Sequence, residues 1–224
     1  MSDPPRWQGL SLTFAGQYLY ALDDLDANRM RIIDLSQPAA PRLMSDIALP
    51  IHTDRNTRMV ADGHHVYLAT DWGLAIIDVT DPAAPRPVGE PMEWRHNAEQ
   101  LAVAGSYLYL AAGLGGLTVF DVSMPEQPRE VAQLDGLGRV VGVAVDRGRA
   151  IVISDRGFYT FDIGEPGQPQ QQGRVAMPGL MAWAGSAGTK VEDDRAYVLR
   201  HHPGAKAEIA VFDIADLQLP RLLY

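Results

Sequence analysis

One strand pattern recurs five times along the chain, and this recurrence constrains the fold more than any other feature. Each copy is a segment rich in apolar or aromatic residues that ends in an aspartate, and the five aspartates are Asp34, Asp78, Asp121, Asp162 and Asp213. They are separated by 44, 43, 41 and 51 positions. β-Branched and aromatic residues before the aspartates favour strands. A strand unit repeated at this period indicates a repeat architecture.

Prolines follow the first four aspartates at fixed offsets of four and seven positions: Pro38 and Pro41, Pro82 and Pro85, Pro125 and Pro128, Pro166 and Pro169. The fifth copy departs from this pattern, because Leu217 stands where the first proline is expected. Proline fixes φ and donates no N–H, so each pair ends a strand and builds a rigid turn. We interpret the aspartates as acceptors for downstream backbone N–H groups, because a catalytic site does not need five copies.

The remaining segments of each repeat also predict strands. An upstream strand recurs as Val66–Ala69, Leu108–Ala111 and Ala196–Leu199, and an alternating apolar pair such as Leu101 and Val103 precedes it across a short turn. A fourth strand follows the second proline. Four antiparallel strands per repeat are typical of propeller blades. The sequence therefore predicts an all-β, five-bladed β-propeller of four-stranded antiparallel blades in one domain of residues 1–224. The expected repeats are 8–50, 51–92, 93–134, 135–177 and 178–224.

The charge balance and the absence of cysteine exclude several classes of function. Nineteen basic and 28 acidic residues give a net charge of −9, which disfavours binding to nucleic acid or to an anionic membrane surface. Without cysteine the chain has no disulfide, thiolate ligand or cysteine nucleophile. The first residues lack the basic and apolar run of a secretory signal, and no stretch is apolar enough to span a membrane. We therefore expect a soluble cytoplasmic protein, or an exported one if a signal peptide has been removed.

The segment Gly73–Pro85 reads Gly-Leu-Ala-Ile-Ile-Asp-Val-Thr-Asp-Pro-Ala-Ala-Pro, and Gly116–Pro125 is a second close copy. These segments resemble the LVIVD repeat family, and the resemblance extends over nearly the whole chain. It implies a propeller fold but no shared catalytic motif. Members of the family are often exported surface or periplasmic proteins.

Loop lengths differ between the two ends of the predicted blades. At one end, the distance from each aspartate to its second proline is always seven positions. At the other end, the distance from the upstream strand to the aspartate varies, from 11 positions between Tyr67 and Asp78 to 16 between Tyr197 and Asp213. Binding sites tend to occupy irregular loops on a regular scaffold. The irregular rim is therefore the candidate site.

The loops of this rim carry the candidate ligand-binding residues His52, Arg58, Trp94, Arg95, Arg139 and Trp183, with Trp72 as a further apolar wall. Tryptophans would supply flat apolar surface, and arginines would fix an anionic or polar group. We favour a binding module that recognises a small molecule or a protein partner there.

Two other functions stay open for the same chain. One is an enzyme at this rim that uses His96 with Glu99, or His201 with Asp155, for acid–base chemistry. The other is a structural scaffold protein. A metal site formed by His52, His96 and His201 with Asp54 or Glu99 lacks a diagnostic ligand spacing, so we expect no metal and no other cofactor.

The last predicted strand is short, because only Leu222-Leu223-Tyr224 follows Arg221. Either the amino-terminal Pro5-Arg6-Trp7 completes this blade, or an open edge is left for another chain. We therefore expect compensation by the amino terminus or by homo-oligomer formation.

Overall fold

The computed structural model describes residues 9–23, 28–54, 56–94, 97–177, 188–200 and 208–224. Within these ranges the chain forms strands and turns without helix, and the strands make five four-stranded antiparallel sheets. The predicted all-β class is therefore confirmed. No helix in the described ranges has the length and apolar content needed to cross a membrane. The chain divides into two compact units, Met1–Arg95 with sheets one and two, and His96–Tyr224 with sheets three to five.

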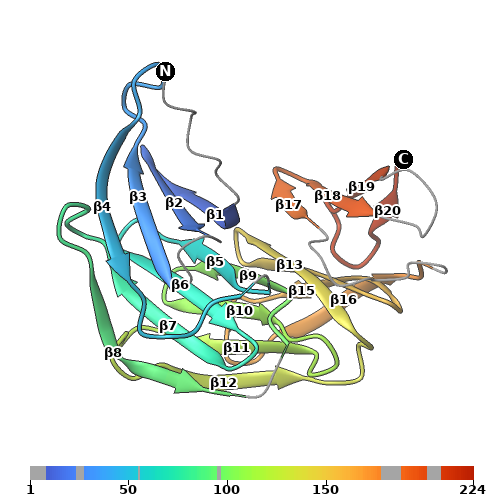
Figure 1. Ribbon diagram of the computed structural model, residues 1–224. Coiled ribbons are helices and arrows are strands. Elements are labelled where there is room, and N and C mark those ends of the chain that lie inside the picture. The colour runs from blue at the N-terminus through green and yellow to red at the C-terminus, as the bar shows by residue number, and fades with distance from the viewer. Residues whose placement is uncertain (1–8, 24–27, 55, 95–96, 178–187, 201–207) are drawn as a thin grey trace. The chain divides into compact units, whose positions relative to one another are not determined.

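The first unit contains two sheets whose strands pair in chain order (Figure 1). Sheet one consists of β1 (Gly9–Ala15), β2 (Tyr18–Asp23), β3 (Arg29–Asp34) and β4 (Arg42–Ala48). Sheet two consists of β5 (Arg58–Ala61), β6 (His65–Thr70), β7 (Gly73–Asp78) and β8 (Arg86–Glu93).

The second unit contains three sheets of the same topology (Figure 1). Sheet three consists of β9 (Gln100–Ala104), β10 (Tyr107–Ala111), β11 (Leu117–Asp121) and β12 (Arg129–Leu134). Sheet four consists of β13 (Val140–Asp146), β14 (Arg149–Ser154), β15 (Gly157–Asp162) and β16 (Gln170–Val175). Sheet five consists of β17 (Thr189–Glu192), β18 (Arg195–Arg200), β19 (Glu208–Asp213) and β20 (Arg221–Leu222). Beyond β20, the Leu223 N–H donates to the Val211 carbonyl at 2.7 Å, so pairing with β19 continues toward the chain end.

The repeated aspartate ends the third strand of every sheet and accepts a hydrogen bond from the backbone N–H two residues downstream. The five N–H donors lie 2.8 to 3.0 Å from the carboxylate oxygens and belong to Ser36, Thr80, Ser123, Gly164 and Ala215. A short acceptor side chain at this position stabilises the turn into the outer strand. The interpretation of the aspartates as turn acceptors is confirmed.

Asp78 gives a prediction for the pH dependence of stability. The backbone N–H and the hydroxyl of Thr80, together with the Arg86 guanidinium, lower the pKa of Asp78 to about 2. The unfolded value is about 3.9, so this stabilisation is fully present above about pH 4 and is lost as the pH falls toward 2. In thermal melts, Asp78→Asn should therefore unfold at a lower temperature than the wild type at pH 7 and at nearly the same temperature at pH 2. A melting-temperature difference that does not shrink in acid would contradict this.

Each sheet has two faces, and neighbouring sheets of the same unit pack on each other through apolar residues. We name the face toward the next sheet in the chain the forward face, and the opposite one the rear face. In sheet four, Ile151, Ile153 and Phe158 form the forward face and pack with Ala196, Val198, Ala210 and Phe212 of sheet five. The rear face of sheet four packs on the forward face of sheet three through Ala150, Val152, Tyr159 and Phe161 against Tyr109, Ala111, Leu117 and Val119.

In the first unit, the forward face of sheet one packs on the rear face of sheet two in the same way. The buried residues of this interface include Tyr20, Leu22, Met30 and Ile32 from sheet one, and Met59, Val66, Leu68, Ala75 and Ile77 from sheet two. Alternation along each strand thus sends one set of side chains forward and the other set to the rear.

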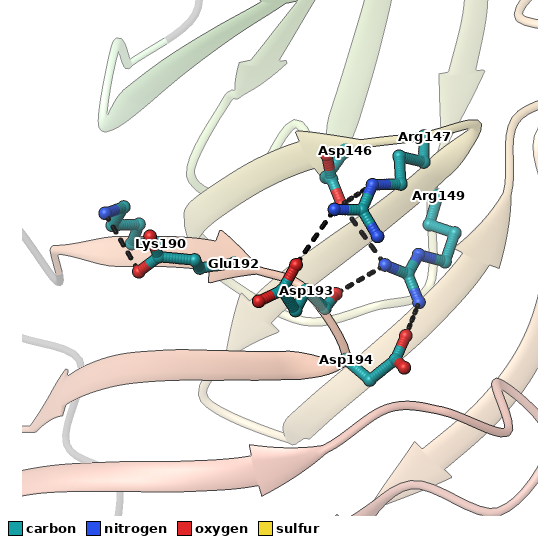
Figure 2. A network of polar contacts seen from close by, with 7 residues as sticks. All are labelled: Asp146, Arg147, Arg149, Lys190, Glu192, Asp193 and Asp194. Carbon is teal, nitrogen blue, oxygen red and sulfur yellow. Dashed lines mark hydrogen bonds and ion pairs between the residues drawn. The ribbon is translucent and has the colours of Figure 1, made fainter.

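Sheets four and five are also joined by a charged network at the turns between their first two strands (Figure 2). The Arg147 guanidinium lies 3.0 Å from an Asp193 carboxylate oxygen. Arg149 donates to the Asp194 carboxylate at 3.0 Å and to the Asp193 carbonyl at 2.6 Å. Arg147 and Asp193 have φ values of 47° and 52°, at turn positions where the first three sheets have glycine. At these two turns the conformational freedom of glycine is lost, and the side chains that replace it form contacts between sheets four and five.

Candidate functional site

The loops of variable length join the second and third strands of each sheet and connect one sheet to the next, and we name this end of each sheet the irregular end. Among the hairpin loops, Asp71–Trp72 and Asp155–Arg156 are the shortest, whereas residues 112–116 form a longer loop. The opposite ends carry the aspartate and proline turns. The irregular ends are considered separately in each unit.

In the first unit, the linker from sheet one to sheet two is fixed by polar contacts. The Thr53 N–H donates to the Asn28 side-chain oxygen at 2.7 Å, and the Asn28 N–H donates to the Thr53 hydroxyl at 3.0 Å. Further along, the Asn56 side-chain amide donates to an Asp71 carboxylate oxygen at 3.1 Å. Thr53 is buried. The linker is therefore tied both to the β2–β3 loop and to the β6–β7 loop.

Two tryptophans near this linker have opposite environments. Trp94 is 9% exposed, and its indole N–H donates to the Thr70 carbonyl at 2.8 Å. Trp72 is 66% exposed at the tip of the β6–β7 hairpin, although its backbone N–H is fixed by the Thr70 hydroxyl at 3.1 Å. Trp94 thus contributes mainly to the packing of the loop, whereas Trp72 presents its ring to solvent.

In the second unit, a carboxylate and a guanidinium form an ion pair at the irregular end. Arg139 Nη2 donates to Glu99 Oε1 at 2.6 Å, and the Glu99 side chain is 5% exposed while that of Arg139 is 32% exposed. Glu99 directly precedes β9, and Arg139 directly precedes β13. The contact therefore joins the starts of the first strands of sheets three and four. It holds one edge of the guanidinium against protein and leaves part of the side chain in contact with solvent.

The backbone around Arg139 is held as firmly as its side chain. The Arg139 N–H donates to an Asp155 carboxylate oxygen at 2.9 Å, and the Asp155 N–H donates to the Arg139 carbonyl at 3.1 Å. The Ser154 hydroxyl donates to the Leu137 carbonyl at 2.6 Å. Val140 exchanges two backbone hydrogen bonds with Gly113. Arg139 is thus presented on a loop with a defined conformation, which favours specific binding.

Among the described residues at the irregular end of the second unit, Leu114 is the most exposed large apolar one, at 85%. It lies at the tip of the β10–β11 loop, between Gly113 and Gly116, both with positive φ. This hairpin of sheet three corresponds by repeat to the hairpin of sheet two that carries Trp72.

The structure places the predicted site residues as follows. His52 is exposed, Arg58 is half-buried and Trp94 is buried in the first unit. In the second unit Glu99 and Arg139 lie together, although the sequence nominated them for different roles. Arg95, His96, Trp183 and His201 lie outside the described residues. The binding and catalytic roles of all these residues stay predictions.

Neither Leu114 nor the Glu99–Arg139 pair was identified as such from the sequence. The sequence feature that could have identified Leu114 is its position between glycines in a loop of variable length. The ion pair joins residues 40 positions apart, so no local pattern indicates it. Among the described residues, no three histidine, aspartate or glutamate side chains are grouped so that they could hold a metal ion.

The repeats match a known family. The sequence profile of the LVIVD repeat matches residues 11–48, 56–91 and 96–135, which together make up just over half of the chain. This chain belongs to the LVIVD repeat family. The three matched segments correspond to sheets one, two and three of the LVIVD protein. No curated protein matches its sequence.

Solved structures share the fold of the LVIVD protein at low sequence identity. The β-propeller domain of Cps50 (Swd1) from Myceliophteria thermophila is 12% identical, with a TM-score of 0.62 over 96% of this chain and 73% of that one. The periplasmic gluconolactonase PpgL of Pseudomonas aeruginosa is 14% identical, with a TM-score of 0.72 over 96% of this chain and 70% of that one. The N-terminal domain of Nup159 is 13% identical, with a TM-score of 0.59 over 95% of this chain. The LVIVD protein spans only 60% of that domain. These likenesses confirm the β-propeller fold.

Proposed function

We propose that the LVIVD protein is a binding module that recognises a protein partner at the irregular ends of its sheets. The observation that carries this proposal is the exposure of Trp72 at 66% and Leu114 at 85%, at corresponding hairpin tips of sheets two and three. A single exposed apolar residue is ordinary on a protein surface. Two at the same position of consecutive repeats, at the end where loop length varies, favour a role in contact with another molecule.

Polar groups at the irregular end of each unit also support a protein partner. The Arg139 side chain is anchored by Glu99 and is 32% exposed, which suits a contact with a carboxylate on the partner. Tryptophan and arginine are enriched among the residues that dominate protein–protein binding energy. His52 and Arg58 are further candidates for contacts in the first unit. The loops that carry these groups are fixed by hydrogen bonds, so they lose little conformational entropy on binding.

A protein partner also agrees with a solved complex of Nup159, a protein of similar fold. In one solved S. cerevisiae structure, Dbp5 is bound to Nup159 and Gle1. For a small molecule, the two tryptophans in the described residues give less support, because Trp94 is largely covered and Trp72 stands at a hairpin tip. The proposal therefore commits to a protein.

Site-specific photo-cross-linking tests this proposal and identifies the partner in the same experiment. A photoreactive phenylalanine analogue is placed at position 72, 114 or, as a control, 124, in cells of the source organism. Met124 is 49% exposed in the β11–β12 turn, at the opposite end of sheet three. We expect positions 72 and 114 to capture the same protein, and position 124 not to capture it. Equal capture from all three positions, or none from 72 and 114, would contradict the proposal.

A further inference from the structure

The dipeptide Asp-Gly occurs twice in the chain, as Asp62-Gly63 in the first unit and as Asp135-Gly136 in the second. The backbone nitrogen of the residue after an aspartate can attack the side-chain carboxyl carbon and close a five-membered succinimide ring. Glycine permits this attack most readily, because it has no Cβ beside the attacking nitrogen. Both dipeptides are therefore candidate sites for a spontaneous change of the backbone.

The two glycines have similar surroundings. Gly63 and Gly136 both have positive φ, of 101° and 78°. A Cβ at either position would meet no atom within 4 Å. Asp62 and Asp135 are both exposed, and each directly follows the last residue of a strand, β5 in one case and β12 in the other. Neither exposure nor the glycine conformation therefore distinguishes the two sites.

The carboxylate of Asp62 is held by three hydrogen bonds. The backbone N–H groups of His64 and His65 donate to Oδ1 at 2.8 and 2.7 Å, and the Tyr67 hydroxyl donates to Oδ2 at 2.9 Å. Burial raises the pKa of Asp62, but these hydrogen bonds outweigh burial and lower the pKa below its ordinary value. An ionised carboxylate is a poor electrophile, and it cannot turn toward the Gly63 nitrogen without losing these bonds. Asp62 is therefore protected.

The carboxylate of Asp135 is held much more weakly. Within the described ranges it accepts one hydrogen bond, from the Gln133 side-chain amide at 3.4 Å. This distance is long for an N–H···O bond. The same amide nitrogen also lies 3.2 Å from the Gly115 carbonyl oxygen, so it is shared between two acceptors. Little therefore prevents the Asp135 side chain from turning toward the Gly136 nitrogen.

We propose that Asp135 isomerises spontaneously to isoaspartate in the folded protein, at a rate that Asp62 does not approach. The Gly136 nitrogen bonds to Cγ of the protonated Asp135 side chain, and the carboxyl hydroxyl leaves as water with the amide hydrogen. Water then adds to one of the two ring carbonyls and breaks its C–N bond, which gives aspartate or isoaspartate. The reaction needs no other reactant, and it is independent of partner binding at the irregular ends.

Isoaspartate would change the linker between sheets three and four. The main chain then runs through the former side chain, which adds one atom to the backbone immediately after β12. The next residue is anchored, because the Gly136 carbonyl accepts a hydrogen bond from the Arg156 guanidinium at 3.0 Å. The added length therefore strains the segment that leads to Arg139. We expect faster amide hydrogen exchange in residues 134–139 of the isomerised protein than in the fresh protein.

The test is peptide mapping of the folded protein after weeks of storage at neutral pH. Electron-transfer fragmentation distinguishes isoaspartate from aspartate by the fragment ions, although the masses are equal. Isoaspartate should form at position 135 at least about 10-fold faster than at position 62, because the attack at Asp62 must first break hydrogen bonds to a charged group. In urea that unfolds the chain, the two sites should isomerise at similar rates.

Two variants test the cause of the difference. Tyr67→Phe removes one of the three hydrogen bonds to Asp62, so it should raise the rate at position 62 several-fold and leave the rate at position 135 unchanged. Asp135→Glu would need a six-membered ring and should abolish the reaction at position 135. Equal rates at the two sites of the folded wild type would overturn the proposal. So would isoaspartate at position 135 that forms in urea but not in the folded protein.

Discussion

Gly116→Ala should be among the most destabilising single substitutions in this protein. A Cβ at Gly116 would lie 2.1 Å from the Leu134 carbonyl oxygen, which belongs to the paired outer strand β12. The φ of Gly116 is +78°, a region that costs an L-residue about 1–2 kcal/mol. The clash with backbone adds about 1–3 kcal/mol, because neither strand can move without losing its pairing. We expect a total loss of about 3 kcal/mol in urea or thermal unfolding.

Gly136→Ala is a matched control for this substitution. Gly136 also has a φ of +78°, but a Cβ there would meet no atom within 4 Å. It should therefore cost only the backbone strain, about 1 kcal/mol. Gly73 and Gly157 occupy the same place as Gly116 in sheets two and four, and a Cβ at either would lie 2.4 Å from a carbonyl oxygen of the outer strand. If the two substitutions lowered the free energy of unfolding equally, this would contradict the close approach of Gly116 to the outer strand β12.

Arg139→Met should destabilise the second unit and loosen its irregular end. It leaves the Glu99 carboxylate, which is 5% exposed, without the guanidinium now 2.6 Å away. Removing one partner of a fully buried ion pair typically costs about 3–5 kcal/mol. Because Arg139 is about one third exposed, the pair is partly screened by solvent, and we expect a loss of about 2 kcal/mol.

Two further variants separate the ion pair from other effects of the substitution. Arg156→Met changes an exposed arginine in the neighbouring β14–β15 turn and should have little effect on the unfolding midpoint. Glu99→Gln combined with Arg139→Met removes the buried negative charge that Arg139→Met leaves behind, and should recover part of the stability lost in Arg139→Met. Glu99→Gln is also measured alone. If its loss of stability adds in full to that of Arg139→Met in the double variant, the two side chains are not coupled.

The architecture could be predicted because its signals are local. An aspartate at the end of a strand bonds an N–H two residues away, and the prolines that follow act on their own backbone. Both signals are contained in a few residues and recur in register. The substitution of glycine by Arg147 and Asp193 at two turns could not be understood in this way, because their ion pair joins two repeats.

The environments of the candidate site residues depend on contacts between distant segments. The sequence nominated Trp94 as part of the apolar surface of a ligand site, and in the structure its indole N–H reaches the Thr70 carbonyl 24 positions away and the side chain is covered. Trp72, which was nominated as a further apolar wall, stands one residue before a strand and is exposed. Glu99 and Arg139 were nominated separately, for acid–base chemistry and for anion binding. Their pairing follows from how sheets three and four begin, which no local pattern specifies.

The affinity of the captured partner for defined variants tests most directly the claim that the irregular ends form the binding surface. With the purified partner, isothermal titration calorimetry should give a dissociation constant at least about 10-fold weaker for Trp72→Ala and for Leu114→Ala than for the wild type. Met124→Ala, at the opposite end of sheet three, should bind like the wild type. Unchanged affinity in both irregular-end variants, or an equal loss in Met124→Ala, would contradict the account.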